Sequence, residues 1–130
     1  MQDGRVFLYA DGGLLGRRNP CVEGVHWSVY ADPPGHVVLR EQSTAYHTNN
    51  EAEWLACAAA LRWAALHCPG AAVTLRMDSR FVVNGFNGKW HIKILRMRRL
   101  LHQCRAAAAA IPDVVLEWRP RRELVKRVGH

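Results

Sequence analysis

The sequence predicts an α/β fold in which a mixed five-stranded sheet carries helices on its faces. The first third of the chain holds three short apolar segments separated by turns, which is typical of an antiparallel meander. The rest alternates helical stretches with two further apolar runs, which places more strands between helices. A hydrophobic share of 49% in 130 residues indicates one domain with a sizeable core.

The first three strands are predicted at Arg5 to Ala10, Gly24 to Ala31 and His36 to Ser43. The first is a nearly continuous apolar run, as expected of a buried strand. A loop rich in glycine and proline follows it from residue 12 to residue 24. In the second strand alternate residues are apolar, and residues 32–35 (Asp-Pro-Pro-Gly) form a strong turn signal before the chain returns.

A long helix is predicted from Asn50 to His67, because apolar residues recur there at spacings of three and four. Asn49 or Asn50 is the expected N-cap, and Glu51 and Glu53 suit the first turn, where carboxylates interact favourably with the helix dipole. Pro69 and Gly70 end this helix.

The second half of the chain continues with a strand at 72–77 and a short helix at 79–84. A glycine-rich break precedes a second long helix at 92–110. Its expected apolar side consists of Ile94, Leu95, Met97, Leu100, Leu101 and Cys104. Residues 111–113 stop that helix, and a fifth strand follows at 114–118. The strongly basic tail, residues 119–130, is expected to be helical in part.

Charge and cysteine usage narrow the class of protein. The formal charge is +7 and the isoelectric point about 9.8, which favours polyanionic partners, nucleic acid first and a membrane surface second. A merely soluble basic protein is the equal alternative on charge alone. No apolar run approaches the roughly 20 residues that span a bilayer. The first residues show no signal-peptide pattern, so we expect a cytoplasmic protein. The four cysteines form no Cys-x-x-Cys pair, which argues for free thiols and against a zinc site.

Three carboxylates stand in the most informative settings of the chain. Asp11 and Asp78 each follow an apolar run predicted as a strand, and Glu53 lies in the first turn of the long helix. If the two strands are neighbours and the helix packs on them, the three acids converge, and cations must neutralise them. Oxygen ligands suit magnesium or manganese, and the combination with a basic chain suggests metal-assisted phosphodiester cleavage. The alternative is three ordinary surface acids.

Taken in order along the chain, the segments that hold these acids resemble those of type 1 ribonuclease H. The similarity runs from Arg5 to about Arg121. One departure is Cys21, which stands where the family usually has the glycine of Asn-Pro-Gly. The segments that carry the resemblance are Tyr9-Ala10-Asp11-Gly12-Gly13, Asn19-Pro20, Thr48-Asn49-Asn50-Glu51-Ala52-Glu53, Asp78-Ser79-Arg80, Asn87-Gly88-Lys89-Trp90 and Glu117-Trp118-Arg119-Pro120-Arg121.

The resemblance implies one ribonuclease H-like catalytic domain over residues 1–130 that hydrolyses the RNA strand of RNA–DNA hybrids. Two Mg²⁺ or Mn²⁺ ions would assist, roughly 3.5–4 Å apart, with Asp11 as the shared ligand and Glu53 and Asp78 on either side. The expected partner is the hybrid, with no membrane and no obligate protein partner, and the chain is expected to be a monomer. Two alternatives stay open: a catalytically weak hybrid-binding module, and another nuclease of the superfamily, resolvase-like or integrase-like.

The same resemblance assigns contacts to the hybrid. Amide and guanidinium side chains would bind 2′-hydroxyls in the minor groove. A second set of residues would contact the sugar or phosphate of the DNA strand. Two of these residues have an alternative role: Asn49 could cap the helix, and Trp90 could lie in the core. The other tryptophans are expected in the core: Trp27, Trp54, Trp63 and Trp118. The expected contacts are Asn19, Asn49, Asn50 and Arg80 for the RNA strand, and Lys89, Trp90 and Lys93 for the DNA strand.

Two further features of the basic half leave alternatives open. Arg96 and Arg99 share a helix face, which suits either a phosphate track or a solvated surface. The family's fourth metal-binding acid has no counterpart after Trp118, because Val128 stands in its register. His130 is the candidate fourth ligand, which would favour manganese. It could also be the family's mobile histidine, a frayed end without a role, or the last residue before a lost acid.

Overall fold

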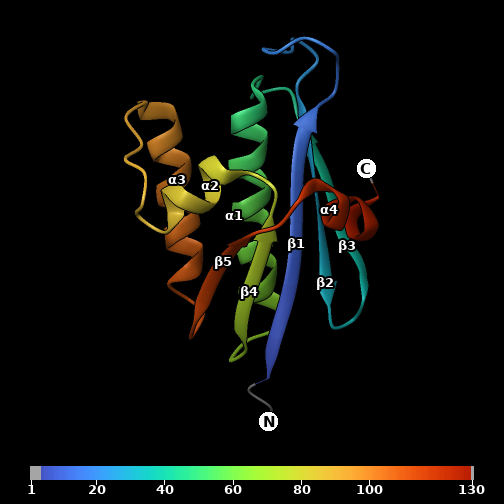
Figure 1. Ribbon diagram of the computed structural model, residues 1–130, viewed down its shortest axis with the longest axis vertical. Helices are drawn as coiled ribbons and strands as arrows, with labels where there is room; N and C mark the ends of the chain where they lie inside the picture. Colours follow the sequence, from blue (N-terminus) through green and yellow to red (C-terminus); the bar gives the residue numbers. More distant parts are fainter. Residues whose placement is uncertain (1–3, 130) are drawn as a thin grey trace.

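The computed structural model describes residues 4–129, and its sheet is the predicted one. Five strands lie in the order β3-β2-β1-β4-β5 (Figure 1). The first three form an antiparallel meander, and β4 and β5 add to it in parallel. Their bounds are Arg5–Leu14 (β1), Val25–Asp32 (β2), His36–Ser43 (β3), Ala72–Met77 (β4) and Val114–Trp118 (β5).

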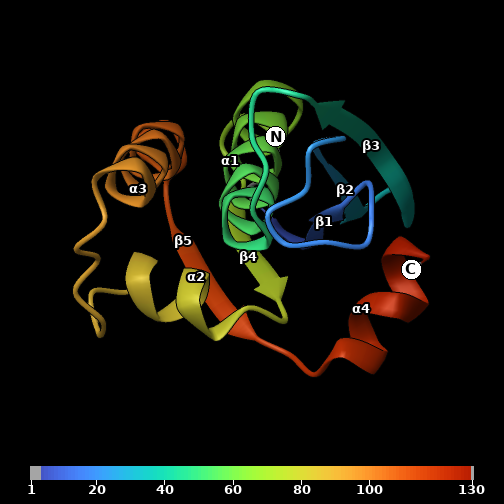
Figure 2. The same cartoon turned by 90° about the horizontal axis from the view of Figure 1, so that it is seen from above.

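Four helices flank the sheet, α1 (Asn49–His67), α2 (Arg80–Phe86), α3 (Leu95–Ala108) and α4 (Arg121–Val128). Seen from above, α1 and α3 lie side by side on one face of the sheet and α4 on the other, while α2 packs against α1 and β5 (Figure 2). The partly helical tail predicted from sequence is therefore confirmed.

The first strand is longer than predicted, and this corrects the expected place of Asp11. We expected the strand to end at Ala10 and a loop to begin at residue 12. Instead β1 continues to Leu14, because β2 pairs with it as far as the partners Leu14 and Val25. The parallel pairing with β4 stops at Tyr9, so Asp11 lies inside β1, just beyond the part that β4 covers.

The two later helices also differ from their predicted bounds. The helix α2 runs past Asn84 to Phe86, since Gly85 leaves room for Trp54 and Ile92 to pack closely against it. The helix α3 begins at Leu95 rather than Ile92, because Ile94 has an extended backbone. Ile94 and Leu95 were predicted on its apolar side and are exposed, while Met97, Leu100, Leu101 and Cys104 are buried as expected.

The core lies between the sheet and α1, which is buried almost all round from residue 51 to residue 61 by the sheet on one side and α3 on the other. Trp27 and Trp54 belong to this core, as predicted. Trp63 and Trp118 are half-buried at its edge, so their prediction holds only in part. Within residues 4–129 no helix is long and apolar enough to cross a membrane.

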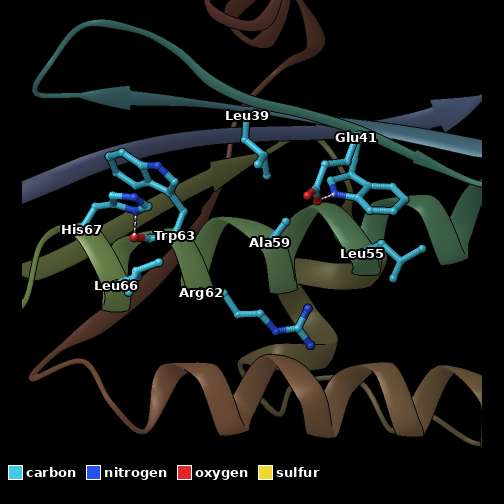
Figure 3. Close-up of a pocket in the computed structure, with 9 residues that line it drawn as sticks. Leu39, Glu41, Leu55, Ala59, Arg62, Trp63, Leu66 and His67 are labelled. Carbon is cyan, nitrogen blue, oxygen red and sulfur yellow. Dashed lines mark hydrogen bonds between the residues drawn. The ribbon is translucent and has the colours of Figure 1, made fainter.

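A shallow apolar groove runs along α1 where the helix faces β3 (Figure 3). The Trp63 indole stacks on the His67 ring with centroids 5.0 Å apart, and Leu66 projects beside them. The groove holds one carboxylate, Glu41, which accepts a hydrogen bond from the Trp27 indole at 2.9 Å. The three acids that could together hold a metal ion, Asp11, Glu53 and Asp78, do not line it, so the candidate site lies elsewhere.

Candidate active site

The three predicted carboxylates meet at one end of the sheet. Asp11 comes from β1, Glu53 from the first turns of α1, and Asp78 from the residue that follows β4. One ligand oxygen from each lies within 4.8 Å of the others. The convergence expected from sequence is therefore what the structure shows.

Burial and mutual repulsion make this cluster resist ionisation. Burial, and next the charge of Asp78, raise the pKa of Asp11 to about 7. Burial raises the pKa of Glu53 to about 7 as well, with Asp78 again the next cause. The positive charge of Arg121 opposes both shifts, and its Nη1 also lies 3.2 Å from Asp78 Oδ2. Groups held this far from their usual pKa are typical of functional sites.

These pKa shifts predict how stability depends on pH without metal. The folded protein holds protons on Asp11 and Glu53 up to about pH 7, while the unfolded chain releases them near pH 4. Their stabilising contribution is complete below about pH 4 and is lost as pH rises through 7. In calorimetry with chelator, we expect Asp11→Asn to reduce the fall in melting temperature between pH 5 and pH 8. Millimolar Mn²⁺ or Mg²⁺ should raise the parent's melting temperature by about 5 °C at pH 8 and much less at pH 5. An equal rise at both pH values would contradict this origin.

Gly12 allows α1 to approach β1 closely enough to bring Glu53 beside Asp11. A Cβ atom built on Gly12 would overlap the backbone carbonyl of Ala52 and would lie 2.9 Å from the amide nitrogen of Glu53. Only glycine leaves room for this approach of helix and strand. The glycine beside the first acid is thus part of the site's construction.

The start of α1 is capped by Thr48, which corrects the expected N-cap at Asn49 or Asn50. The Thr48 hydroxyl accepts a hydrogen bond from the Glu51 amide, and the Glu51 side chain accepts one from the Thr48 amide, which is a capping box. Burial alone would raise the pKa of Glu51, but hydrogen bonds from His47 and Thr48 outweigh it and lower the pKa. Asn49 and Asn50 are therefore not needed to cap the helix.

The structure brings together the polar residues predicted to read the RNA strand. Asn19, from the loop between β1 and β2, accepts a hydrogen bond through Oδ1 from the Asn49 amide at 3.2 Å. Asn50 is exposed beside it. Arg80 stands at the start of α2, where its guanidinium carbon lies 4.0 Å from the centroid of the Trp118 ring, whose indole donates to the Asp78 carbonyl.

The family model described as RNase H matches residues 3–112 of this sequence. The chain belongs to the ribonuclease H family. The matched region contains all three carboxylates and ends just before β5. Neighbouring structures share the five-stranded mixed sheet and its flanking helices, so the predicted ribonuclease H fold is confirmed.

Curated relatives agree with this membership of the ribonuclease H family. The chain is 34% identical over 119 residues to the bifunctional protein Rv2228c of Mycobacterium tuberculosis. That match covers 90% of this chain and 32% of the relative, so the chain spans about a third of the length of its mycobacterial relatives. It is also 36% identical over 90 residues to the ribonuclease H of Lachnoclostridium phytofermentans, covering 66% of this chain and 54% of that one.

Solved ribonuclease H structures superpose on most of the chain. The RNase H1 of Halobacterium salinarum gives a TM-score of 0.79 at 28% identity, covering 96% of this chain and 92% of that one. The N-terminal RNase H domain of Rv2228c from Mycobacterium tuberculosis gives 0.78 at 25% identity, with coverages of 95% and 87%. LC11-RNase H1, solved with an RNA/DNA hybrid, gives 0.77 at 23% identity, with coverages of 94% and 90%.

The predicted contacts to the DNA strand lie apart from this ribonuclease H site. Lys89, Trp90 and Lys93 belong to the segment between α2 and α3, which both views place on the side of α2 away from β4 (Figures 1 and 2). Trp90 is 48% exposed, which rules out the core position kept as its alternative. This basic segment and the acids therefore form two separate surfaces.

Sequence reasoning missed two residues of the ribonuclease H cleft. A cavity of about 360 Å³ opens beside Asp11, Glu53 and Asn49, and it is also lined by His26 and Arg121. His26 faces Gly13 across the pairing of β1 with β2, and burial followed by the charge of Arg40 lowers its pKa. Arg121 ends the last segment of the family resemblance, which implies no role for it. Neither position carries a local signal, because strand pairing and the docking of α4 bring each of them to the acids.

Val128, which the resemblance predicts in register with the family's fourth acid, has no side-chain atom that could bind a metal. Val128 is fully buried in a small cluster with Tyr9 and Leu124, and its carbonyl accepts a hydrogen bond from Arg40 at 3.0 Å. The helix α4 ends immediately afterwards at Gly129, whose φ of 86° is typical of a glycine C-cap. His130, the candidate fourth ligand, lies outside the described residues.

Proposed function

We propose that this chain is a metal-dependent ribonuclease H that hydrolyses the RNA strand of RNA–DNA hybrids. The observation that carries the proposal is the meeting of Asp11, Glu53 and Asp78 within 4.8 Å in a family of this name. The net charge of +7 suits a polyanionic substrate. LC11-RNase H1, which shares the fold, was solved with such a hybrid. The described residues share one sheet and one main core, which supports a single catalytic domain.

The carboxylate cluster fits divalent cations. Three acids whose ligand oxygens lie this close carry charge that a cation relieves, and two of them have their pKa raised to about 7 by burial and repulsion. We propose that Asp11 is shared between two ions, Mg²⁺ or Mn²⁺, with Glu53 and Asp78 each holding one. Ions held in this way lower the pKa of bound water and stabilise a leaving oxygen.

The other residues at the cleft have separate tasks in this proposal. Arg121 offsets part of the negative charge around Asp78 before cations bind. The amide of Asn49 and the side chain of Asn19 hold the loop between β1 and β2 against the start of α1. Asn50 and Arg80 are exposed around the acids, where amide and guanidinium groups can bind sugar hydroxyls and phosphates.

A cleavage assay on four labelled substrates tests this function. Matched RNA–DNA hybrid, duplex RNA, duplex DNA and single-stranded RNA are incubated with Mg²⁺ and with Mn²⁺, and Asp11→Asn protein purified in the same way serves as the control for contaminating nuclease. We expect metal-dependent cleavage of the hybrid's RNA strand only. Cleavage of duplex DNA would instead support the resolvase-like alternative. If no substrate is cleaved with either ion, the proposal that the chain is an enzyme is refuted.

One observation favours a second candidate, a catalytically weak hybrid-binding module. Val128, which the resemblance puts in register with the family's fourth acid, has an apolar side chain and is fully buried. If that acid is essential, the protein should bind hybrid without cutting it. Fluorescence anisotropy with the same four substrates separates the two candidates, because the module predicts selective hybrid binding with a turnover no higher than that of Asp11→Asn.

Recognition is expected to depend on the sugar rather than on base sequence. Replacing Asn49 and Asn50 together by Ala should lower kcat/KM on hybrids about tenfold or more, because two hydrogen-bonding side chains are lost, each worth about 1 kcal/mol. The loss should be similar for hybrids of unrelated sequence. DNA carrying a single ribonucleotide should be cut poorly by the parent. Efficient cleavage at a lone ribonucleotide would contradict the placement among type 1 enzymes.

His130 remains the proposed fourth ligand, and two variants test it. His130→Asp should raise activity in Mg²⁺, since a carboxylate suits this ion better than an imidazole does. His130→Ala should lower activity in both ions, and the parent's activity should fall as pH drops through the histidine range, because protonation competes with metal. An His130→Ala enzyme that matches the parent from pH 6 to pH 8 in both ions would exclude the residue.

A further inference from the structure

Glu51 is a fully buried carboxylate next to the site whose partners extend beyond its own helix. Its Oε1 accepts hydrogen bonds from the His47 amide at 3.1 Å, the Thr48 amide at 3.0 Å and the Thr48 hydroxyl at 2.9 Å. These bonds fix the backbone that leads into α1. Its other oxygen, Oε2, forms an ion pair with Arg96.

Arg96 comes from a different part of the fold. It lies in the first turn of α3, directly after the basic segment that contains Lys89, Trp90 and Lys93. Its side chain is 61% exposed, yet its guanidinium reaches the buried Glu51. The ion pair therefore joins the start of α1, which carries Asn49, Asn50 and Glu53, to the end of the basic segment.

We propose that Glu51 and Arg96 are positioning residues, which hold the start of α1 and the basic segment before α3 at a fixed separation so that one hybrid contacts both. This inference rests on the proposed function, because it assigns the two surfaces to the two strands of the same substrate. It competes with the phosphate track expected on α3, since Arg96 forms an ion pair with a carboxylate of its own chain.

The physical basis is the cost of leaving Glu51 without its cation. A buried carboxylate that loses its charged partner must recruit water or shift, and here any shift moves the capping box and the first turn of α1. Packing alone does not replace this restraint, because the flanking Ile94 and Leu95 at the start of α3 are exposed. Met97, the residue after Arg96, is buried in the core, so the ion pair adds a polar contact to the apolar packing at this end of the two helices.

A double-mutant cycle tests the pair. Arg96→Ala, Glu51→Gln and the double variant are compared with the parent. Gln keeps an acceptor oxygen for the His47 and Thr48 amides and loses the charge and the acceptor that faces Arg96. The matched control is Arg62→Ala, because Arg62 also bridges α1 to α3, through Gln103 at 3.1 Å, but at a point far along both helices from the site. Arg96→Lys tests rescue by a conservative cation.

The KM for hybrid cleavage should be about fivefold higher in Arg96→Ala than in the parent. Adding Arg96→Ala to Glu51→Gln should raise the KM no further. Arg96→Lys and Arg62→Ala should have KM values near that of the parent. The dependence of hybrid affinity on salt, measured in an Asp11→Asn background, should be unchanged by Arg96→Ala. A slope lower by about 1 would make Arg96 a phosphate contact and overturn the proposal.

A readout independent of cleavage keeps this proposal separate from the proposed function. Amide hydrogen exchange at His47 and Thr48 should be about tenfold faster in Arg96→Ala than in the parent and unchanged in Arg62→Ala. Unchanged exchange in Arg96→Ala would overturn the positioning role even if the enzyme cleaves hybrids. A different outcome is that exchange is faster in Arg96→Ala but the parent neither binds nor cuts hybrid. That outcome would refute the proposed function and, with it, the assignment of the two surfaces to one substrate.

Discussion

Asp11→Asn should lower hybrid cleavage by at least about 100-fold while the protein stays folded. Asp11 is buried between the other two acids and is the proposed shared ligand, so an amide at this position removes charge from both ions. The loss of a shared metal ligand should cost several kcal/mol of transition-state stabilisation, and each 1.4 kcal/mol is about tenfold in rate. The measurement is single-turnover cleavage of a labelled hybrid in Mg²⁺ and Mn²⁺.

The same substitution should raise thermal stability in chelator above pH 7, which separates lost chemistry from lost structure. It relieves the repulsion that, after burial, raises the pKa of Asp11 to about 7. Asp113→Asn is a suitable control, because that aspartate pairs with Arg5 in an exposed position away from the acids and should leave cleavage unchanged. An Asp11→Asn enzyme with more than about a tenth of the parent rate would sink the site assignment.

Gly12→Ala should damage both stability and activity, although it adds only one methyl group. The new Cβ would overlap the Ala52 carbonyl, and neither backbone can move without separating β1 from α1. Overpacking of this kind costs about 1–3 kcal/mol or more. Because the movement would pull Glu53 away from Asp11, we expect cleavage to fall about 100-fold as well. Denaturant unfolding and cleavage of the hybrid at 25 °C measure the two effects.

Gly13→Ala is the matched control for this prediction. A Cβ at Gly13 would meet the end of the His26 side chain at 3.1 Å, and a side chain can give way where a backbone carbonyl cannot. We therefore expect a much smaller loss of stability at Gly13. If the two variants unfold at the same denaturant concentration, the close approach of α1 at Gly12 does not limit the site.

Several elements follow from local sequence alone because their signals lie within a few residues of each other. The strands His36–Ser43 and Ala72–Met77 were predicted with their observed bounds, since alternation, β-branched residues and flanking turns define them. The acids Asp11, Glu53 and Asp78 were predicted to converge because each stands at the end of a recognisable segment. Family motifs in order then supplied the fold.

Three local features were predicted wrongly. The predicted end of β1 was wrong because pairing with β2 extends the strand to Leu14. The predicted N-cap was wrong because Thr48 and Glu51 form a capping box. Ile94 and Leu95 fit the helical period, which predicted them on the buried side of α3. They are exposed, because Ile94 precedes the helix and Leu95 is its first residue. Only the strand pairing is a long-range effect, because the capping box joins residues three apart.

The sequence by itself determined the fold class, the order of the elements and the three acids, because hydrophobic periodicity, turn residues and short motifs act over short stretches of chain. Only the tertiary structure decided the surroundings of those acids: Arg121 against Asp78, His26 in the cleft, Arg96 on Glu51 and Val128 in an apolar cluster. These contacts join residues far apart in the chain. They depend on strand register and on how the helices dock, which no local pattern specifies.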